Sequence, residues 1–255
     1  MTSEINQNGA QPETRVLRIP YHVGIVMDGN GRWAQSQGKP RIMGHRAGTQ
    51  NIRRVLEASV DFGIKVLTIY AFSTENWGRP PAEVRGLMQL LGQTIRNQLN
   101  ELHEKGVQIR HSGSLVGISP QLKRQISEAL ELTRNNDRII LNVAFNYGGR
   151  AEIVDAVRTI AELVSAGKMK PDAIDERTIA RNLYAPDMPD PDLMVRTSGE
   201  FRISNYLLWE VAYSELVFTD VLWPDFRREH LFDAIREFQG RTRRFGAIDE
   251  PGGPS

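Results

Sequence analysis

The sequence predicts an α/β fold, a single layered domain whose central, mostly parallel β-sheet is flanked by helices. Short apolar runs rich in β-branched and aromatic residues alternate with longer segments whose apolar residues recur at helical spacing. No internal repeat or long linker interrupts this alternation, which is typical of a parallel sheet. In such sheets ligands bind beyond the carboxyl ends of the strands, and four charged motifs directly follow predicted strands.

Five apolar runs predict the strands of this sheet. The clearest are "VLTIYAF" and "IILNVAF", which polar segments bound on both sides. A compact apolar run follows His22 and ends in turn residues. Two shorter apolar runs are the remaining predicted strands. The predicted strands are 23–27, 66–72, 107–111, 139–145 and 193–196.

The longest predicted helix starts at Val84 and carries one broad apolar stripe over about twenty residues. The stripe comprises Val84, Leu87, Met88, Leu91, Ile95, Leu99 and Leu102. Amphipathic spacing predicts further helices at 46–62, 119–134, 150–166, 175–184 and 229–244.

Composition narrows the class of protein. The 255 residues carry a net charge of +1 and are 40% hydrophobic, which suits a globular domain without the electrostatic footprint of a nucleic-acid binder. The absence of Cys excludes disulfides and thiolate chemistry. No apolar run approaches the roughly 20 residues that span a bilayer, and the polar N-terminus lacks the apolar core of a signal peptide. We expect a cytoplasmic protein with disordered tails at 1–17 and 249–255 around one domain at 18–248.

The motif that follows the first predicted strand is the richest in chemistry. Glycines in Asp28-Gly29-Asn30-Gly31-Arg32-Trp33 allow backbone N–H groups to approach an anion, and several cations follow. Asp28 has the wrong sign to bind phosphate, but it suits a Mg²⁺ ion that bridges to one. An ordinary turn with a solvated basic face is an equally open interpretation. The cations are Arg32, Lys39, Arg41, His45 and Arg46.

The other strand ends carry polar groups of the same kind. Ser73, Asn76 and Arg79 follow the second predicted strand, although a capping turn before Pro80 would explain them too. The segment 196–205 places two arginines and two serines around a glycine turn, either as a second phosphate clamp or as surface ion pairs. Glu215 stands in an apolar stretch, where a carboxylate needs a cationic, donor or metal partner.

Several absent motifs exclude other chemistries. The Gly-rich segment is neither G-x-G-x-x-G nor G-x-x-x-x-G-K-[ST], so it does not indicate a dinucleotide or Walker-type nucleotide site. The sequence contains no D-D-x-x-D, H-E-x-x-H or G-x-S-x-G. Its five histidines are scattered, which argues against a histidine metal site.

Taken together, six motifs in this order resemble the cis-prenyltransferases, over residues of about 20–246. The motifs are "HVGIVMDGNGRWA", "GHRAG", "YAFSTENWGRP", "NYGGR", "RTSGEFRISNYLLWE" and "ELVFTDVLWPDF". The resemblance implies a homodimer that condenses isopentenyl diphosphate onto an allylic diphosphate such as farnesyl diphosphate. It also implies Mg²⁺ as cofactor, release of pyrophosphate and an apolar product tunnel. An undecaprenyl-like product for cell-wall lipid carrier synthesis is expected, with peripheral membrane contact through that product.

The resemblance also implies roles for individual residues. Asp28 would engage Mg²⁺ with Glu215 as second carboxylate, while Ser73 and Asn76 would assist near the reacting carbons. The segment Gly29, Asn30, Gly31, Arg32 and Trp33 would bind the allylic diphosphate together with Arg41 and His45. Isopentenyl diphosphate would be bound by Arg196, Arg202 and Ser204. The mobile loop before the long helix would contain Trp77, Arg79 and Glu83. Arg244, in an R-x-G signature, would reach a phosphate site across the dimer.

The length of the product and the residues that line the product tunnel stay open at this point. A short-chain synthase and, less favoured, a non-catalytic family subunit are the alternatives to an undecaprenyl synthase. Ala71 and Ile139 are the expected tunnel contacts. The chain departs from the commoner family pattern at Ser198, in "RTSGE" for "RTGGE", and at Glu210, in "LLWE" for "LLWQ".

Overall fold

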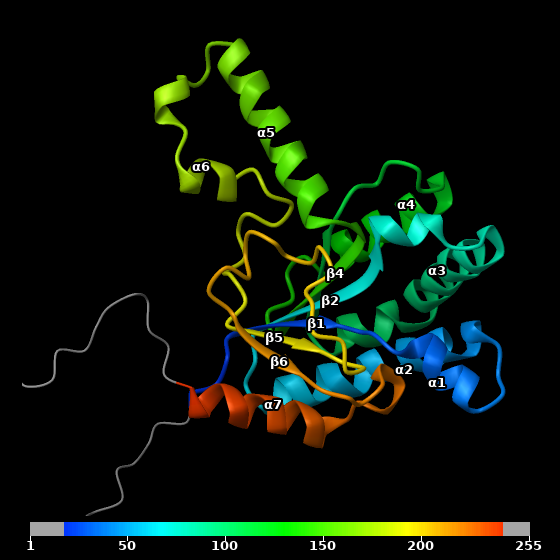
Figure 1. Cartoon of the computed structure of the whole chain (residues 1–255). Coiled ribbons are helices and arrows are strands. Elements are labelled where there is room, and N and C mark those ends of the chain that lie inside the picture. The colour runs from blue at the N-terminus through cyan, green and yellow to red at the C-terminus, as the bar shows by residue number, and fades with distance from the viewer. Residues whose placement is uncertain (1–17, 242–255) are drawn as a thin grey trace, which may run out of the picture.

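The computed structural model describes residues 18–241, in which six strands form one parallel sheet (Figure 1). The strand order across the sheet is β3-β4-β2-β1-β5-β6, and every neighbouring pair is parallel. The predicted parallel sheet is therefore confirmed. The strands are β1 His22–Val26, β2 Val66–Ser73, β3 Val107–Ser112, β4 Ile139–Tyr147, β5 Leu193–Arg196 and β6 Glu215–Phe218.

The strand order places a topological switch point between β1 and β5. From β1 the chain moves to β2 on one side, and only after β4 does it cross to β5 on the other side. Ligands in sheets of this kind bind where the strand order reverses, outside the carboxyl ends of the strands. Asp28 and Arg196 lie at that position, because Val26 at the end of β1 pairs with Arg196 at the end of β5.

Helices cover both faces of the sheet, and α5 projects away from it with the short α6 nearby (Figure 1). The α-helices are α1 Asn30–Ser36, α2 Arg41–Asp61, α3 Pro81–Glu104, α4 Pro120–Thr133, α5 Gly149–Ser165, α6 Glu176–Ala180 and α7 Arg228–Gly240. Three 3₁₀ turns join them: η1 Thr74–Gly78, η2 Pro171–Ala173 and η3 Trp223–Asp225. None of the helices within 18–241 is long and apolar enough to cross a membrane.

The core explains why the strands are nearly continuous apolar runs. Ile25, Leu67 and Leu193 are completely or almost completely buried and pack with Trp223 and Phe238 in one cluster. Strands of a parallel sheet are buried on both faces, so alternation with polar residues is not required. Local signals set the helix ends: Pro81 opens α3 in the first turn, where a missing N–H costs no hydrogen bond.

Most predicted elements lie within a few residues of the observed ones, with three differences. Two elements were not predicted: α1, because glycines at its start resemble a turn, and β6, because it has only four residues. The helix expected at 175–184 is reduced to α6, since the N–H of Tyr184 donates to a carboxylate oxygen of Glu152 instead of a helix carbonyl. The expected tails, with residues 242–248, lie outside the described residues.

Candidate active site

A polar cleft of about 510 Å³ lies at the carboxyl ends of β1, β2 and β5. We call it the polar cleft. It gathers most of the residues that the sequence singled out, although they come from four separate segments. The predicted site residues that line it are Asp28, Gly29, Asn30, Gly31, Arg41, His45, Ser73, Asn76, Arg79, Arg196 and Ser204.

Asp28 is held among positive groups on the β1 side of the polar cleft. Its Oδ1 accepts the Gly29 N–H at 2.6 Å, and its Oδ2 lies 3.0 Å from Arg196 Nη2 and 3.5 Å from Arg32 Nη2. Partial burial alone would raise the pKa of Asp28. The hydrogen bonds from Arg196 and Gly29, with the charges of Arg196 and Arg32, outweigh burial and lower that pKa. Asp28 is therefore an ionised carboxylate at neutral pH.

Arg196 is the buried cation of the polar cleft, at the last position of β5. Its Nη1 donates to Ser204 Oγ at 2.6 Å and to the carbonyl of Arg202, while Nη2 reaches Asp28. The neighbouring Thr197 hydroxyl accepts the Asp28 N–H at 2.9 Å and donates to the Asp28 carbonyl at 2.7 Å. The β5 end thus fixes both the backbone and the side chain of Asp28.

Arg32 is anchored by Ser198, a residue in a rare backbone conformation. Arg32 Nη2 donates to Ser198 Oγ at 2.6 Å, and Nη1 donates to the Ser198 carbonyl at 3.1 Å. Ser198 has φ of 82°, in the left-handed region that favours glycine. The departure from "RTGGE" therefore costs backbone strain and supplies a hydroxyl that holds Arg32.

A second basic group forms on the α2 and α3 side of the polar cleft. The carboxylate of Glu83 lies 3.1 Å from Arg79 Nη1, 3.6 Å from Arg41 Nε and 3.7 Å from His45 Nε2. Burial, followed by the charge of Arg79, lowers the pKa of His45 to about 4, although Glu83 opposes the shift. Among the described residues, His45 Nε2 has no hydrogen-bond partner, so it can still bond a ligand.

Ser73 and Asn76 lie together at the carboxyl end of β2. Asn76 Oδ1 accepts the Ser73 N–H at 3.2 Å, which ties the first turn of η1 to the strand. Next to them, Glu75 accepts a hydrogen bond of 2.7 Å from the Asn205 side chain. The polar cleft is thereby closed on this side by contacts between two distant segments.

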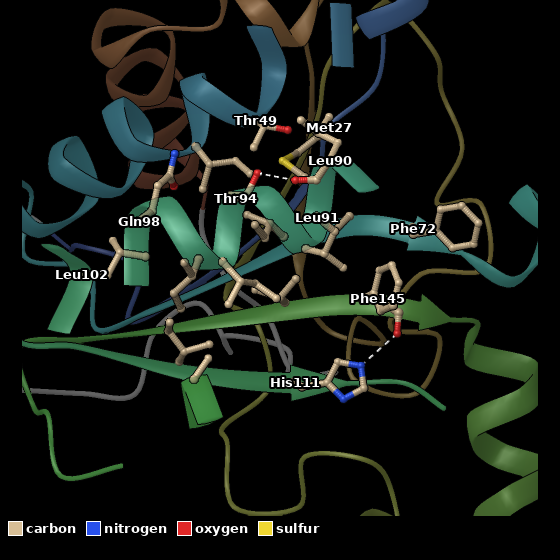
Figure 2. Close-up of a pocket in the computed structure, with 18 of the residues that line it drawn as sticks. Met27, Thr49, Phe72, Leu90, Leu91, Thr94, Gln98, Leu102, His111 and Phe145 are labelled. Carbon is tan, nitrogen blue, oxygen red and sulfur yellow. Dashed lines mark hydrogen bonds between the residues drawn. The ribbon is translucent and has the colours of Figure 1, made fainter. Parts of the chain in front are cut away.

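An apolar cavity of about 170 Å³ adjoins the polar cleft and extends between the sheet, α2 and α3. The two share the lining residues Met27, Asn30, His45, Ala71 and Leu87. Figure 2 shows Phe72, Phe145 and His111 towards one end of the cavity and Leu102 and Gln98 towards the other. Of the two expected tunnel contacts, Ala71 lines this cavity, and Ile139 does not, because it is packed into the core beyond Leu141.

The few hydroxyls in the apolar cavity are already satisfied. Thr94 Oγ1 donates to the Leu90 carbonyl at 2.8 Å, and Thr49 Oγ1 donates to the His45 carbonyl at 2.9 Å. Because each threonine bonds within its own helix, neither needs a polar ligand. Most of the remaining lining is aliphatic or aromatic, so the cavity is suited to a hydrocarbon chain.

Several predicted site residues do not line the polar cleft. The Trp33 ring N–H donates to Asp225 at 2.8 Å, and the Trp77 ring N–H donates to Asn146 at 2.7 Å. The side chain of Arg202 is mostly exposed and pairs with Glu200 at 2.5 Å. Arg244 lies outside the described residues.

Glu215 is not brought to Asp28 within one chain. It begins β6 opposite Leu193, three residues before Arg196, so it lies roughly 10 Å further down the sheet than Arg196. There its carboxylate pairs with Arg241 at 3.0 Å. One chain therefore does not bring Asp28 and Glu215 together, since Glu215 stands at the opposite end of its strand, and a metal shared by the two carboxylates stays a prediction. Within 18–241 no group of three His, Asp or Glu could hold a metal ion.

The sequence analysis gave no role to several residues that build the site. Thr197, Ser198 and Asn205 lie within a quoted motif, but their contacts depend on left-handed φ values at Ser198 and Asn205 that sequence spacing does not reveal. Glu83 was expected in a mobile loop. In the structure it stands in the first turn of α3, among the cations of the polar cleft.

Known proteins are similar to this chain in sequence and in fold. The family model described as putative undecaprenyl diphosphate synthase matches residues 26–246. An isoprenyl transferase from Heliobacterium mobile is 53% identical over 91% of the chain and 89% of its own length. A lavandulyl diphosphate synthase from Lavandula x intermedia, crystallised with dimethylallyl diphosphate, has a TM-score of 0.87. It is 36% identical, over 90% of this chain and 99% of that one.

A solved structure of a bacterial protein is also similar to this chain. A probable undecaprenyl diphosphate synthase from Campylobacter jejuni has a TM-score of 0.76 and 30% identity, covering 90% of this chain and all of that one. The fold and these relatives place the chain among the prenyltransferases, a class of transferases. More narrowly, it belongs to the undecaprenyl diphosphate synthase family of cis-prenyltransferases.

Proposed function

We propose that this enzyme condenses isopentenyl diphosphate units onto an allylic diphosphate, with farnesyl diphosphate as the expected primer. It releases pyrophosphate at each step and makes a polyprenyl diphosphate of undecaprenyl-like length. The observation that carries the proposal is the junction of a basic polar cleft with an apolar cavity. Such a junction matches a substrate with an anionic head and a hydrocarbon tail.

The allylic diphosphate belongs on the α2 and α3 side of the polar cleft. Arg41, His45 and Arg79 surround the Glu83 carboxylate there, so their geometry already accommodates an anion. From this position the hydrocarbon tail enters the apolar cavity past Ala71 and Leu87, which line both spaces.

Isopentenyl diphosphate belongs near Arg196 and Ser204, on the β5 side. The buried guanidinium of Arg196 is fixed by three oxygen partners, so it is preorganised for an incoming diphosphate. Arg32, held by Ser198, adds positive charge beside Asp28. Ser73 and Asn76 would assist removal of the proton that leaves C2 of the isopentenyl unit as its new double bond forms, since both line the polar cleft.

Asp28 has the properties of a Mg²⁺ ligand. It is ionised and partly exposed, and Mg²⁺ is commonly bound by one or two carboxylates plus substrate phosphates. Bound Mg²⁺ would neutralise negative charge that builds on the departing pyrophosphate. The fixed arginines share that task, and the apolar cavity excludes water from the allylic carbon as it gains positive character.

We further propose that the chain works as a homodimer in the cytoplasm and contacts membranes peripherally through its lipid product. Any role of Glu215 or Arg244 at a diphosphate then depends on the second copy. The small cavity, and the relative with a lavandulyl product name, keep a short-chain synthase as the second candidate.

The test combines purified protein with farnesyl diphosphate, radiolabelled isopentenyl diphosphate and Mg²⁺. We expect label in a butanol-extractable polyprenyl diphosphate, because each condensation adds five carbons to a lipophilic chain. Chromatographic sizing separates an undecaprenyl product from a short one. A complete lack of extractable label over a range of allylic primers would refute the proposal.

A further inference from the structure

The apolar cavity runs along most of α3. Its lining begins at Leu87, beside the polar cleft, and reaches Leu102, fifteen residues later, which is roughly 22 Å at the helical rise. On the opposite wall, α2 contributes residues from His45 to Leu56. A hydrocarbon chain that grows from the polar cleft therefore advances between α2 and α3 towards Leu102 (Figure 2).

Four charged side chains join α2 to α3 near this far end. We call them the interhelical clasp: Arg53 and Glu57 of α2 with Glu101 of α3 and Lys105, the residue that follows the last turn of α3. The guanidinium of Arg53 makes two charged contacts with the Glu101 carboxylate, from Nη2 to Oε1 at 2.7 Å and from Nη1 to Oε2 at 3.0 Å. Lys105 Nζ lies 2.7 Å from Glu57 and 2.9 Å from Glu101, and Arg53 Nε lies 3.2 Å from Glu57. The clasp is a closed ring of opposite charges.

One member of the clasp, Arg53, is also part of the cavity wall. Arg53 lines the apolar cavity together with Gln98 and Leu102, while its guanidinium is paired across to the other helix. A two-bond arginine–carboxylate pair holds both the distance and the orientation of its partners. The interhelical clasp therefore joins α2 to α3 beside Leu102, the last residue of α3 that lines the cavity.

We infer that the interhelical clasp sets the upper limit of product length, an inference that rests on the proposed function. A chain that outgrows the cavity must separate α2 from α3 at the clasp and enter a gap lined by charged groups and water. There the further carbons gain no apolar burial, so elongation stops in favour of release. Opening the clasp by charge repulsion should widen this exit and lengthen the products.

The test compares product ladders made by charge-reversal variants from farnesyl diphosphate and isopentenyl diphosphate. Arg53→Glu and Glu101→Arg each place like charges across the gap, and the double variant restores an opposite-charge pair. Arg228→Glu is the matched control, because Arg228 also pairs across helices with α2, through Asp61, but does not line the cavity. Glu101→Gln serves as a milder opening variant, and thermal melting verifies that each protein folds.

We expect both single variants to lengthen the main product by at least one five-carbon unit. The double variant should return towards the parental length, and the control should keep it. Unchanged ladders in Arg53→Glu, Glu101→Arg and Glu101→Gln would overturn the inference while leaving the proposed function intact. The inference would also be overturned if the double variant made products as long as those of the single variants, because cavity shape rather than charge pairing would then set the product length. If the parent makes no polyprenyl product, the proposed function fails and the clasp inference falls with it.

Discussion

Ser198 shows how one residue can trade backbone strain for a functional contact. A non-glycine residue at a φ of 82° is costly, yet its hydroxyl is the atom that holds Arg32 at 2.6 Å. Strain of this kind persists where the surrounding structure uses it. The site therefore contains a residue whose removal should affect stability and substrate binding in different ways.

Replacing Ser198 by Gly and by Ala separates these two effects. Both variants lose the hydroxyl, so both should raise the KM for a diphosphate substrate several-fold while kcat changes less. Only Gly relieves the strained φ, so the Gly variant should be more stable than the Ala variant by about 1 kcal/mol. Urea unfolding and steady-state kinetics measure the two quantities. Equal stabilities of the Gly and Ala variants would contradict the strain, and an unchanged KM would contradict the role of the hydroxyl.

Glu210 is a second residue with an unusual environment, away from the polar cleft. Burial, followed by the charge of Glu152, raises its pKa from 4.5 to about 8. The unfolded chain releases the Glu210 proton near pH 4.5, whereas the folded chain keeps it until about pH 8. The folded state therefore binds more protons in this window, and the free energy of unfolding falls as the pH rises through it.

The variant Glu210→Gln removes this titration and keeps the size of the side chain. We expect its stability to decline less between pH 5 and pH 8 than that of the parent, measured by urea unfolding at both values. Parallel stability profiles for the two proteins would show that Glu210 ionises normally in the folded chain.

At the scale of elements, the close crossing of α1 and α2 positions the start of α1, which lines the polar cleft. A Cβ at Gly44 would lie 1.8 Å from the backbone oxygen of Asn30, and one at Gly48 would lie 1.9 Å from Asn30 Oδ1. Only glycine allows α2 to approach α1 so closely. The glycines of "GHRAG" therefore act on Arg32 indirectly, through the placement of the helix that carries it.

Gly44→Ala should accordingly push α1 away from the polar cleft. We expect a loss of stability of about 1–3 kcal/mol, typical of overpacking, and a lower turnover because Asn30 and Arg32 move. Gly240→Ala is the control, since a Cβ there meets nothing within 4 Å. Denaturant unfolding and turnover assays of both variants provide the comparison. A Gly44→Ala protein as stable and active as the control would refute the tight crossing.

At the scale of the whole molecule, the sequence indicated the sheet well and the site in part. Residues 66–73 and 139–147 form strands where apolar runs predicted them, because burial on both faces leaves a strong local signal. The strand-end rule also placed Asp28 and Arg196 together correctly. Ring contacts of Trp33, the position of Glu215 at the start of β6 and the φ of Ser198 depend on tertiary packing. No local pattern encodes them.

The most direct measurement of the central claim is the incorporation of labelled isopentenyl diphosphate by the parent and by Asp28→Ala, with farnesyl diphosphate and Mg²⁺. Asp28 is partly exposed, and without it the buried Arg196 keeps Ser204 and the Arg202 carbonyl as partners, so the fold should survive, which a thermal melt can check. We predict polyprenyl diphosphate formation by the parent and a loss of turnover on the order of 10²–10³-fold or more in the variant. Near-normal turnover by a folded Asp28→Ala protein would contradict the role of Asp28, and an inactive parent would contradict the proposed function itself.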